Sequence, residues 1–189
     1  MNIPVTISII STAIWILPPI KQYKSDYFYF FLILAFLDVM QPVVFFFLHM
    51  DPRHVAIIFL LFLISSLPSS HKQRYFFIIL GIFTSVFFLG FSFQNSTLTL
   101  IRMAMHVIIV IILINSFVKY TLKVKAVNLF LIILITYELI TVFKFIAGIL
   151  SFEEGAFSYV IATFIQIFFG IAFLFISFKT KDFPIHVKD

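Results

Sequence analysis

Seven apolar stretches occupy almost the whole of this 189-residue chain, and only short polar segments separate them. A helix needs roughly 20 mostly apolar residues to cross a lipid bilayer, and most of the stretches approach that length. With 62% hydrophobic and 11% charged residues, the chain has too little polar surface to cover a core in water. We therefore predict an all-α membrane protein.

The connections are too short to contain a soluble domain, so we expect residues 1–189 to form one seven-helix transmembrane bundle. The N-terminal segment lacks a positively charged start and a small-residue cleavage site, and we expect it to be retained as the first span. Short connections also predict antiparallel packing of neighbouring helices. The spans are expected at residues 3–20, 27–49, 54–68, 75–93, 97–118, 126–149 and 156–178.

Basic residues mark the orientation of the bundle. Ten of the 13 Lys and Arg residues fall in alternate connections, whereas the other connections carry only Arg53 and an acidic pair, Glu153 and Glu154. The positive-inside rule then predicts an outer N-terminus and an inner C-terminus. Such scattered charges do not indicate nucleic-acid binding, although the net charge is +5. The ten are Lys21, Lys24, Lys72, Arg74, Lys119, Lys123, Lys125, Lys179, Lys181 and Lys188.

The two halves of the chain show a weak internal similarity. A shift of 100 residues places residues 30–34 on residues 130–134 and Asp38 on Glu138. This predicts a 3+1+3 parallel internal repeat, with the fourth span as the connector, of the kind whose sites lie between the repeats. The layout is similar to that of SWEET and PQ-loop transporters, which also place the N-terminus outside. Their Pro-Gln pair is absent from the first and fifth spans, and the second span carries the reversed pair Gln41-Pro42. No family residue is carried over.

Ionisable residues inside spans are costly and therefore suggest a site. Asp38, Glu138 and Gln166 are expected near the middle of the membrane, from their distance along each span. Arg102 lies closer to the outer surface, and His106 lies one turn deeper on the same face. We predict a polar cavity between spans 2, 5, 6 and 7 that binds a small solute, a proton or a cation. Its candidate residues are Asp38, Gln41, Arg102, His106, Glu138 and Gln166.

Two features of these spans qualify that prediction. Pro42 has no N–H, so the Asp38 carbonyl four residues earlier loses its helical partner and becomes available to a ligand. Lys144 lies about six residues from the outer end of its span, and we expect its ammonium group to extend to the membrane surface. The alternative, that the buried acids and bases only neutralise one another, is left open by the sequence.

No catalytic residue, cofactor or metal is predicted. The chain has no cysteine, which excludes disulfides, thiolate nucleophiles and cysteine metal sites. His49, Asp51 and His54 have a spacing that zinc could accept, but a solvated outer loop is the simpler interpretation.

The sequence favours a transporter of a small solute or ion in a bacterial cytoplasmic membrane. One alternative is a membrane sensor or scaffold that acts through a protein partner on the cytoplasmic side. Another is an intramembrane lipid-modifying enzyme with His106 and the two acids as its acid–base groups. The expected partners are the lipid bilayer and the solute, proton or cation, with a second copy of the chain or a protein partner left open.

Overall fold

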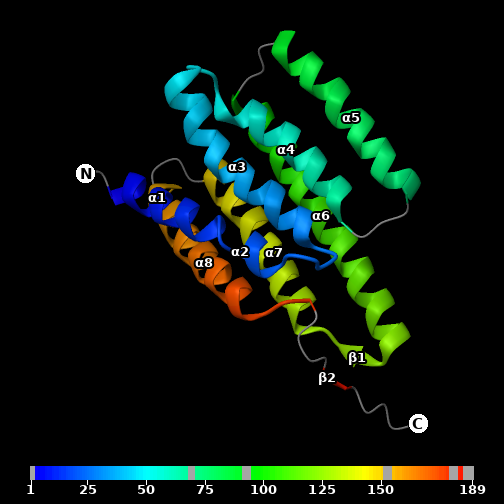
Figure 1. Ribbon diagram of the computed structural model, residues 1–189. Coiled ribbons are helices and arrows are strands. Elements are labelled where there is room, and N and C mark those ends of the chain that lie inside the picture. The colour runs from blue at the N-terminus through cyan, green and yellow to red at the C-terminus, as the bar shows by residue number, and fades with distance from the viewer. Residues whose placement is uncertain (1–2, 68–70, 91–94, 151–154, 179–182, 185–189) are drawn as a thin grey trace.

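A computed structural model shows the chain as a bundle of helices (Figure 1). It describes residues 3–67, 71–90, 95–150, 155–178 and 183–184. The helices in these ranges are α1 (Ile3–Trp15), α2 (Pro18–Lys21), α3 (Phe28–Phe47), α4 (Pro52–Ser66), α5 (His71–Gly90), α6 (Asn95–Val124), α7 (Leu129–Leu150) and α8 (Gly155–Phe175). Two short strands, β1 (Ala126–Val127) and β2 (Phe183–Pro184), pair in antiparallel register.

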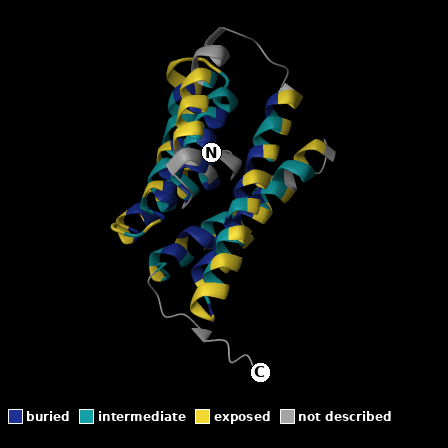
Figure 2. Ribbon diagram, turned by 90° about the vertical axis from the view of Figure 1, so that its right-hand side faces the viewer, coloured by how far each residue is buried: buried dark blue, intermediate teal, exposed yellow. Residues whose placement is uncertain are grey.

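Three helices in the described part of the chain, α3, α6 and α7, are long and apolar enough to cross a membrane. Large apolar side chains also cover the outside of the bundle, as the exposed residues of Figure 2 illustrate. Phe47 is 78% exposed and Phe175 is 77% exposed, a loss of apolar burial that water would penalise and lipid would not. These features are compatible with an integral membrane protein.

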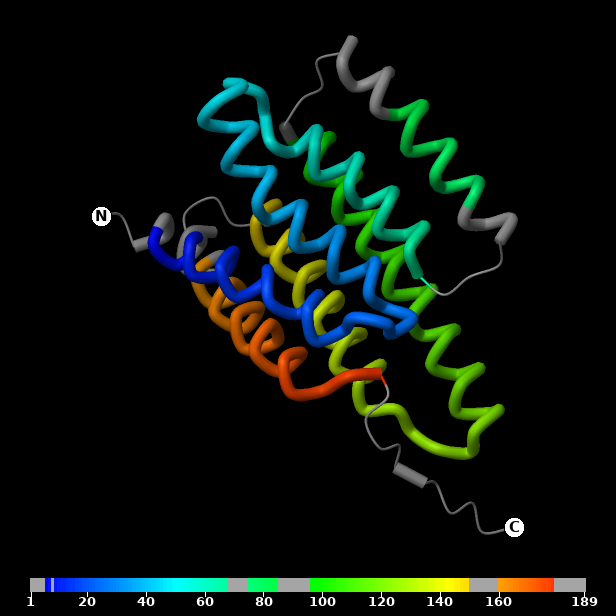
Figure 3. Tube along the Cα trace, in the orientation of Figure 1, coloured from blue at the N-terminus to red at the C-terminus, as the bar shows by residue number. Residues whose placement is uncertain are grey.

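Six helices form a closed ring. In the order α1, α3, α4, α6, α7 and α8, each helix contacts the next, and α8 returns to contact α1. Helix α5 lies outside this ring against α4, which is visible as the separate green helix of Figure 3. Around the ring the helices follow one another in chain order, with α2 and α5 left out.

The first predicted span differs from the structure. We expected one helix over residues 3–20, but α1 ends at Trp15 and α2 begins at Pro18. Proline nitrogens carry no hydrogen, so Pro18 and Pro19 cannot donate to the carbonyls four residues earlier. The N–H of Leu17 instead bonds to the Ile14 carbonyl at 3.1 Å, which tightens the turn.

Side-chain caps fix several helix ends. Asp51 Oδ1 accepts the backbone N–H of Arg53 at 2.9 Å and so caps the first turn of α4, where Pro52 needs no donor. Asn128 Oδ1 accepts the N–H of Leu131 at 3.3 Å at the start of α7. The buried amide of Gln22 donates to carbonyls at the C-terminal end of α8, at 3.1 and 2.9 Å.

Candidate functional site

A cavity of about 420 Å³ lies inside the ring, between α1, α3, α6, α7 and α8. Five of the residues identified from the sequence line it, and they come from α3, α6 and α8: Asp38, Gln41, Arg102, His106 and Gln166. Glu138 lies beside the cavity and reaches it through His106. The structure therefore brings all six predicted residues to one place.

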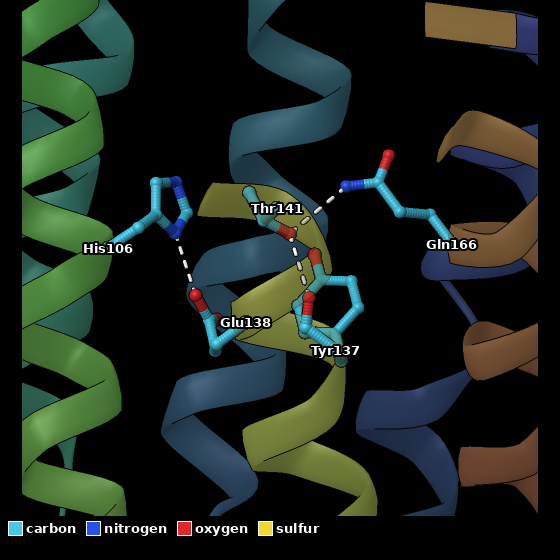
Figure 4. Close-up of polar contacts among 5 residues, drawn as sticks. All are labelled: His106, Tyr137, Glu138, Thr141 and Gln166. Carbon is cyan, nitrogen blue, oxygen red and sulfur yellow. Dashed lines mark hydrogen bonds and ion pairs between the residues drawn. The ribbon is translucent and has the colours of Figure 1, made fainter. Parts of the chain in front are cut away.

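His106 and Glu138 form a buried pair. His106 Nδ1 lies 2.7 Å from Glu138 Oε2, and the two side chains are 6% and 0% exposed. A carboxylate can only accept, so Nδ1 carries the hydrogen between them when Glu138 is ionised. The second oxygen, Glu138 Oε1, has no hydrogen-bond partner among the described residues. Figure 4 shows the pair bridging α6 and α7.

Lys144 does not behave as expected. Its ammonium lies in the cavity rather than at the surface, and it donates to Gln166 Oε1 at 2.9 Å and Thr163 Oγ1 at 3.4 Å. Gln166 Nε2 donates in turn to Thr141 Oγ1 at 3.2 Å, part of the network in Figure 4. The Gln166 and Thr163 oxygens are uncharged, so these two hydrogen bonds orient the ammonium without neutralising it.

The remaining charged groups of the lining lie close to Lys144. Asp38 lines the cavity beside Gln41 and Pro42, and its carboxylate interacts electrostatically with Lys144. The Arg102 guanidinium stacks on Phe145 with 4.9 Å between the guanidinium carbon and the ring centroid, and it too interacts with the charge of Lys144. Arginine on an aromatic face keeps its charge while losing little solvation.

An aromatic cluster closes the cavity toward the end of the bundle where α8 ends. Trp15 and Tyr137 line this end of the cavity, with ring centroids 4.8 Å apart. Below them Phe31 and Phe173 pack edge to face at 4.8 Å, and both are fully buried. We call Trp15, Tyr137, Phe31 and Phe173 the aromatic floor. Because these rings fill one end of the bundle, the cavity lies toward the other end, where α6 begins.

Sequence reasoning missed Lys144, Thr141 and Thr163 as lining residues. A signal for the first two was present, because residues 137, 141, 144 and 148 recur at spacings of four, three and four along one helix face. The snorkelling interpretation of Lys144 outweighed that signal. Among the described residues no group of three His, Cys, Asp or Glu side chains could hold a metal ion.

No family model, curated protein or solved structure matches the chain. The similarity of layout to SWEET and PQ-loop transporters gains no support from these comparisons.

Proposed function

We propose that the chain is a seven-span protein of a bacterial cytoplasmic membrane, with its N-terminus outside, that transports a small solute or ion through the central cavity. Basic residues in alternate connections support this orientation. Under it, the cavity faces outward and the aromatic floor separates it from the cytoplasm.

One observation carries the proposal. Ionisable residues from three different helices, α3, α6 and α7, converge on a single cavity inside the ring, instead of being dispersed as separate surface groups. Polar residues buried in a membrane protein that face a common interior are typical of a substrate or ion path. A cavity of about 420 Å³ also lies within the range of roughly 300–1,000 Å³ that small-molecule sites occupy.

Labelling of introduced cysteines tests transport directly, because the chain has no cysteine of its own. Thr141→Cys places a thiol in the cavity. Thr136→Cys places a thiol on the face of the same helix that points away from the bundle. A transporter alternates access, so the thiol at position 141 should react with membrane-impermeant reagents from both sides of sealed vesicles. The thiol at position 136 should react from neither side, because lipid covers it.

Labelling at position 141 from the outside only would contradict transport and favour the sensor. Labelling from neither side would mean that the polar cluster is a sealed structural element.

A further inference from the structure

The charges around the cavity add up in a way that depends on a single proton. Of the described residues that line the cavity, Arg102 and Lys144 have basic side chains and Asp38 has an acidic one, and we count all three in their ordinary ionised forms. These three sum to +1. The His106–Glu138 pair behind them carries −1 when it holds one proton and 0 when it holds two. The whole cluster is therefore neutral with one proton on the pair and +1 with two.

A cavity enclosed by apolar helices disfavours an uncompensated charge, although less strongly than a dry interior does. The doubly protonated pair thus calls for one small anion in the cavity, and the singly protonated pair calls for none. We propose that the cavity binds a small monocarboxylate together with one proton, which deepens the proposed transport function and rests on it. The anion and the proton enter together, so the charge of the interior does not change.

The geometry assigns the parts of that ligand. Arg102 is seven residues from the start of α6 and Lys144 is six residues from the end of α7, which puts both about 10 Å from the same end of the bundle. The two basic side chains therefore lie at the same depth in the bundle, where one carboxylate can accept hydrogen bonds from both. Beneath it the rings of Trp15 and Tyr137, which are tilted by 41° relative to each other, line the cavity and can contact the apolar rest of the solute.

The proton has a defined position. His106 Nδ1 already faces Glu138 Oε2 at 2.7 Å, so the added proton goes to Nε2.

The charged and titratable groups around His106 come from three helices. They are Arg102 on α6 itself, Tyr137, Glu138 and Lys144 on α7, and Asp38 across the cavity on α3, while α4 carries only Arg53 and His54 in its first turn.

Calorimetry on the full chain in phosphatidylcholine nanodiscs tests the proposal, with butyrate as the carboxylate, choline as the cation and glycerol as the neutral solute. Titrations in two buffers of different ionisation enthalpy count the protons taken up. We expect only butyrate to bind, with about one proton, and its affinity to fall by up to about tenfold per pH unit on the alkaline side.

Two substitutions in the pair should act in opposite directions. Glu138→Gln removes the negative charge, leaves the cluster at +1, and should allow butyrate binding at about pH 8 without proton uptake. His106→Gln keeps a donor toward Glu138 but holds the cluster neutral, so binding should be weak at every pH. A merely structural pair would respond to both changes in the same direction. His54→Gln, outside the cavity, is the matched control and should behave as the wild type.

The outcomes separate the two proposals. Butyrate binding without proton uptake, or equal effects of Glu138→Gln and His106→Gln, would overturn the coupling to a proton. Binding of choline or glycerol without butyrate would overturn the carboxylate while leaving transport intact. Butyrate binding with proton uptake, but with the thiol at position 141 labelled from one side only, would overturn transport and keep the binding site.

Discussion

Closure of the ring depends on the close approach of α1 and α8 at Gly170. A Cβ atom added at Gly170 would lie 2.8 Å from Ile14 Cγ2 and 3.4 Å from Trp15 Cε2. Carbon atoms pack best at about 3.5–4.0 Å, so Gly170→Ala requires the helices to separate by roughly 0.7 Å or more at this point. The γ-methyl of Ile14 cannot swing away easily, because a β-branched side chain in a helix has one strongly preferred rotamer.

Gly148→Ala provides a matched control, because nothing lies within 4 Å of its added Cβ. Each substitution gains about 0.5–1 kcal/mol of helix propensity, which cancels in the comparison. Overpacking costs about 1–3 kcal/mol. We therefore expect the free energy of unfolding of Gly170→Ala to be about 1–3 kcal/mol lower than that of Gly148→Ala.

Unfolding of the purified protein by sodium dodecyl sulfate in mixed micelles measures this difference. Trp15 is the only tryptophan and is 2% exposed, so its fluorescence reports the α1–α8 contact directly. Ile14→Leu removes the clashing Cγ2 while keeping the side-chain size, and it should restore part of the stability of Gly170→Ala. Equal stability of the two alanine variants would refute the close contact and, with it, the closed ring.

Two further predictions concern the helix ends. Gln22→Leu removes the donor to two carbonyls at the end of α8, those of Phe173 and Ile176, and should lower the free energy of unfolding by about 1–3 kcal/mol. Amide hydrogen exchange in the last turn of α8 should become faster. Unchanged exchange there would contradict the capping role. For Asp51, burial alone would raise the pKa of the carboxyl, but the hydrogen bonds and charge of Arg53 outweigh it and hold the pKa below its ordinary value of 3.8. The carboxylate therefore stabilises the fold above pH 3.8 and loses this contribution as the pH falls through the lowered pKa, so Asp51→Ala should cost about 1 kcal/mol at neutral pH and nothing in strong acid, measured by unfolding at both pH values.

The helices could be predicted from the length of the apolar stretches, and the cavity residues from the cost of polar groups in a membrane. In a membrane each polar side chain within a span needs a polar neighbour, so Asp38, Arg102 and Gln166 could be expected to meet before their partners were known. The break after Trp15 was foreseeable from Pro18, but the apolar run across it favoured a single span.

Partner choice could not be predicted in the same way. The shift of 100 residues suggested equal roles for Asp38 and Glu138, yet Glu138 is sealed against His106 and Asp38 faces the cavity. Such roles depend on the rotation of each helix about its axis, which the ring contacts set and the periodicity of one span does not reveal. For the same reason, the sequence did not show that the Lys144 side chain points into the cavity, because its neighbours on α8 are distant in sequence.

The unequal roles of the two acids bear on whether the polar cluster is only structural. Replacing a buried ion pair by apolar residues of similar volume is often neutral or stabilising, by about 1–4 kcal/mol, so stability alone gives little reason to keep charges in so apolar a chain. One sealed pair would be enough to fix the register of α6 on α7, and His106 with Glu138 supplies it. Asp38, Arg102 and Lys144 are held around a cavity instead, where hydration reduces any stabilising attraction between them. A cluster that combines one buried pair with charges facing a cavity of about 420 Å³ is better suited to binding a charged ligand than to holding helices together.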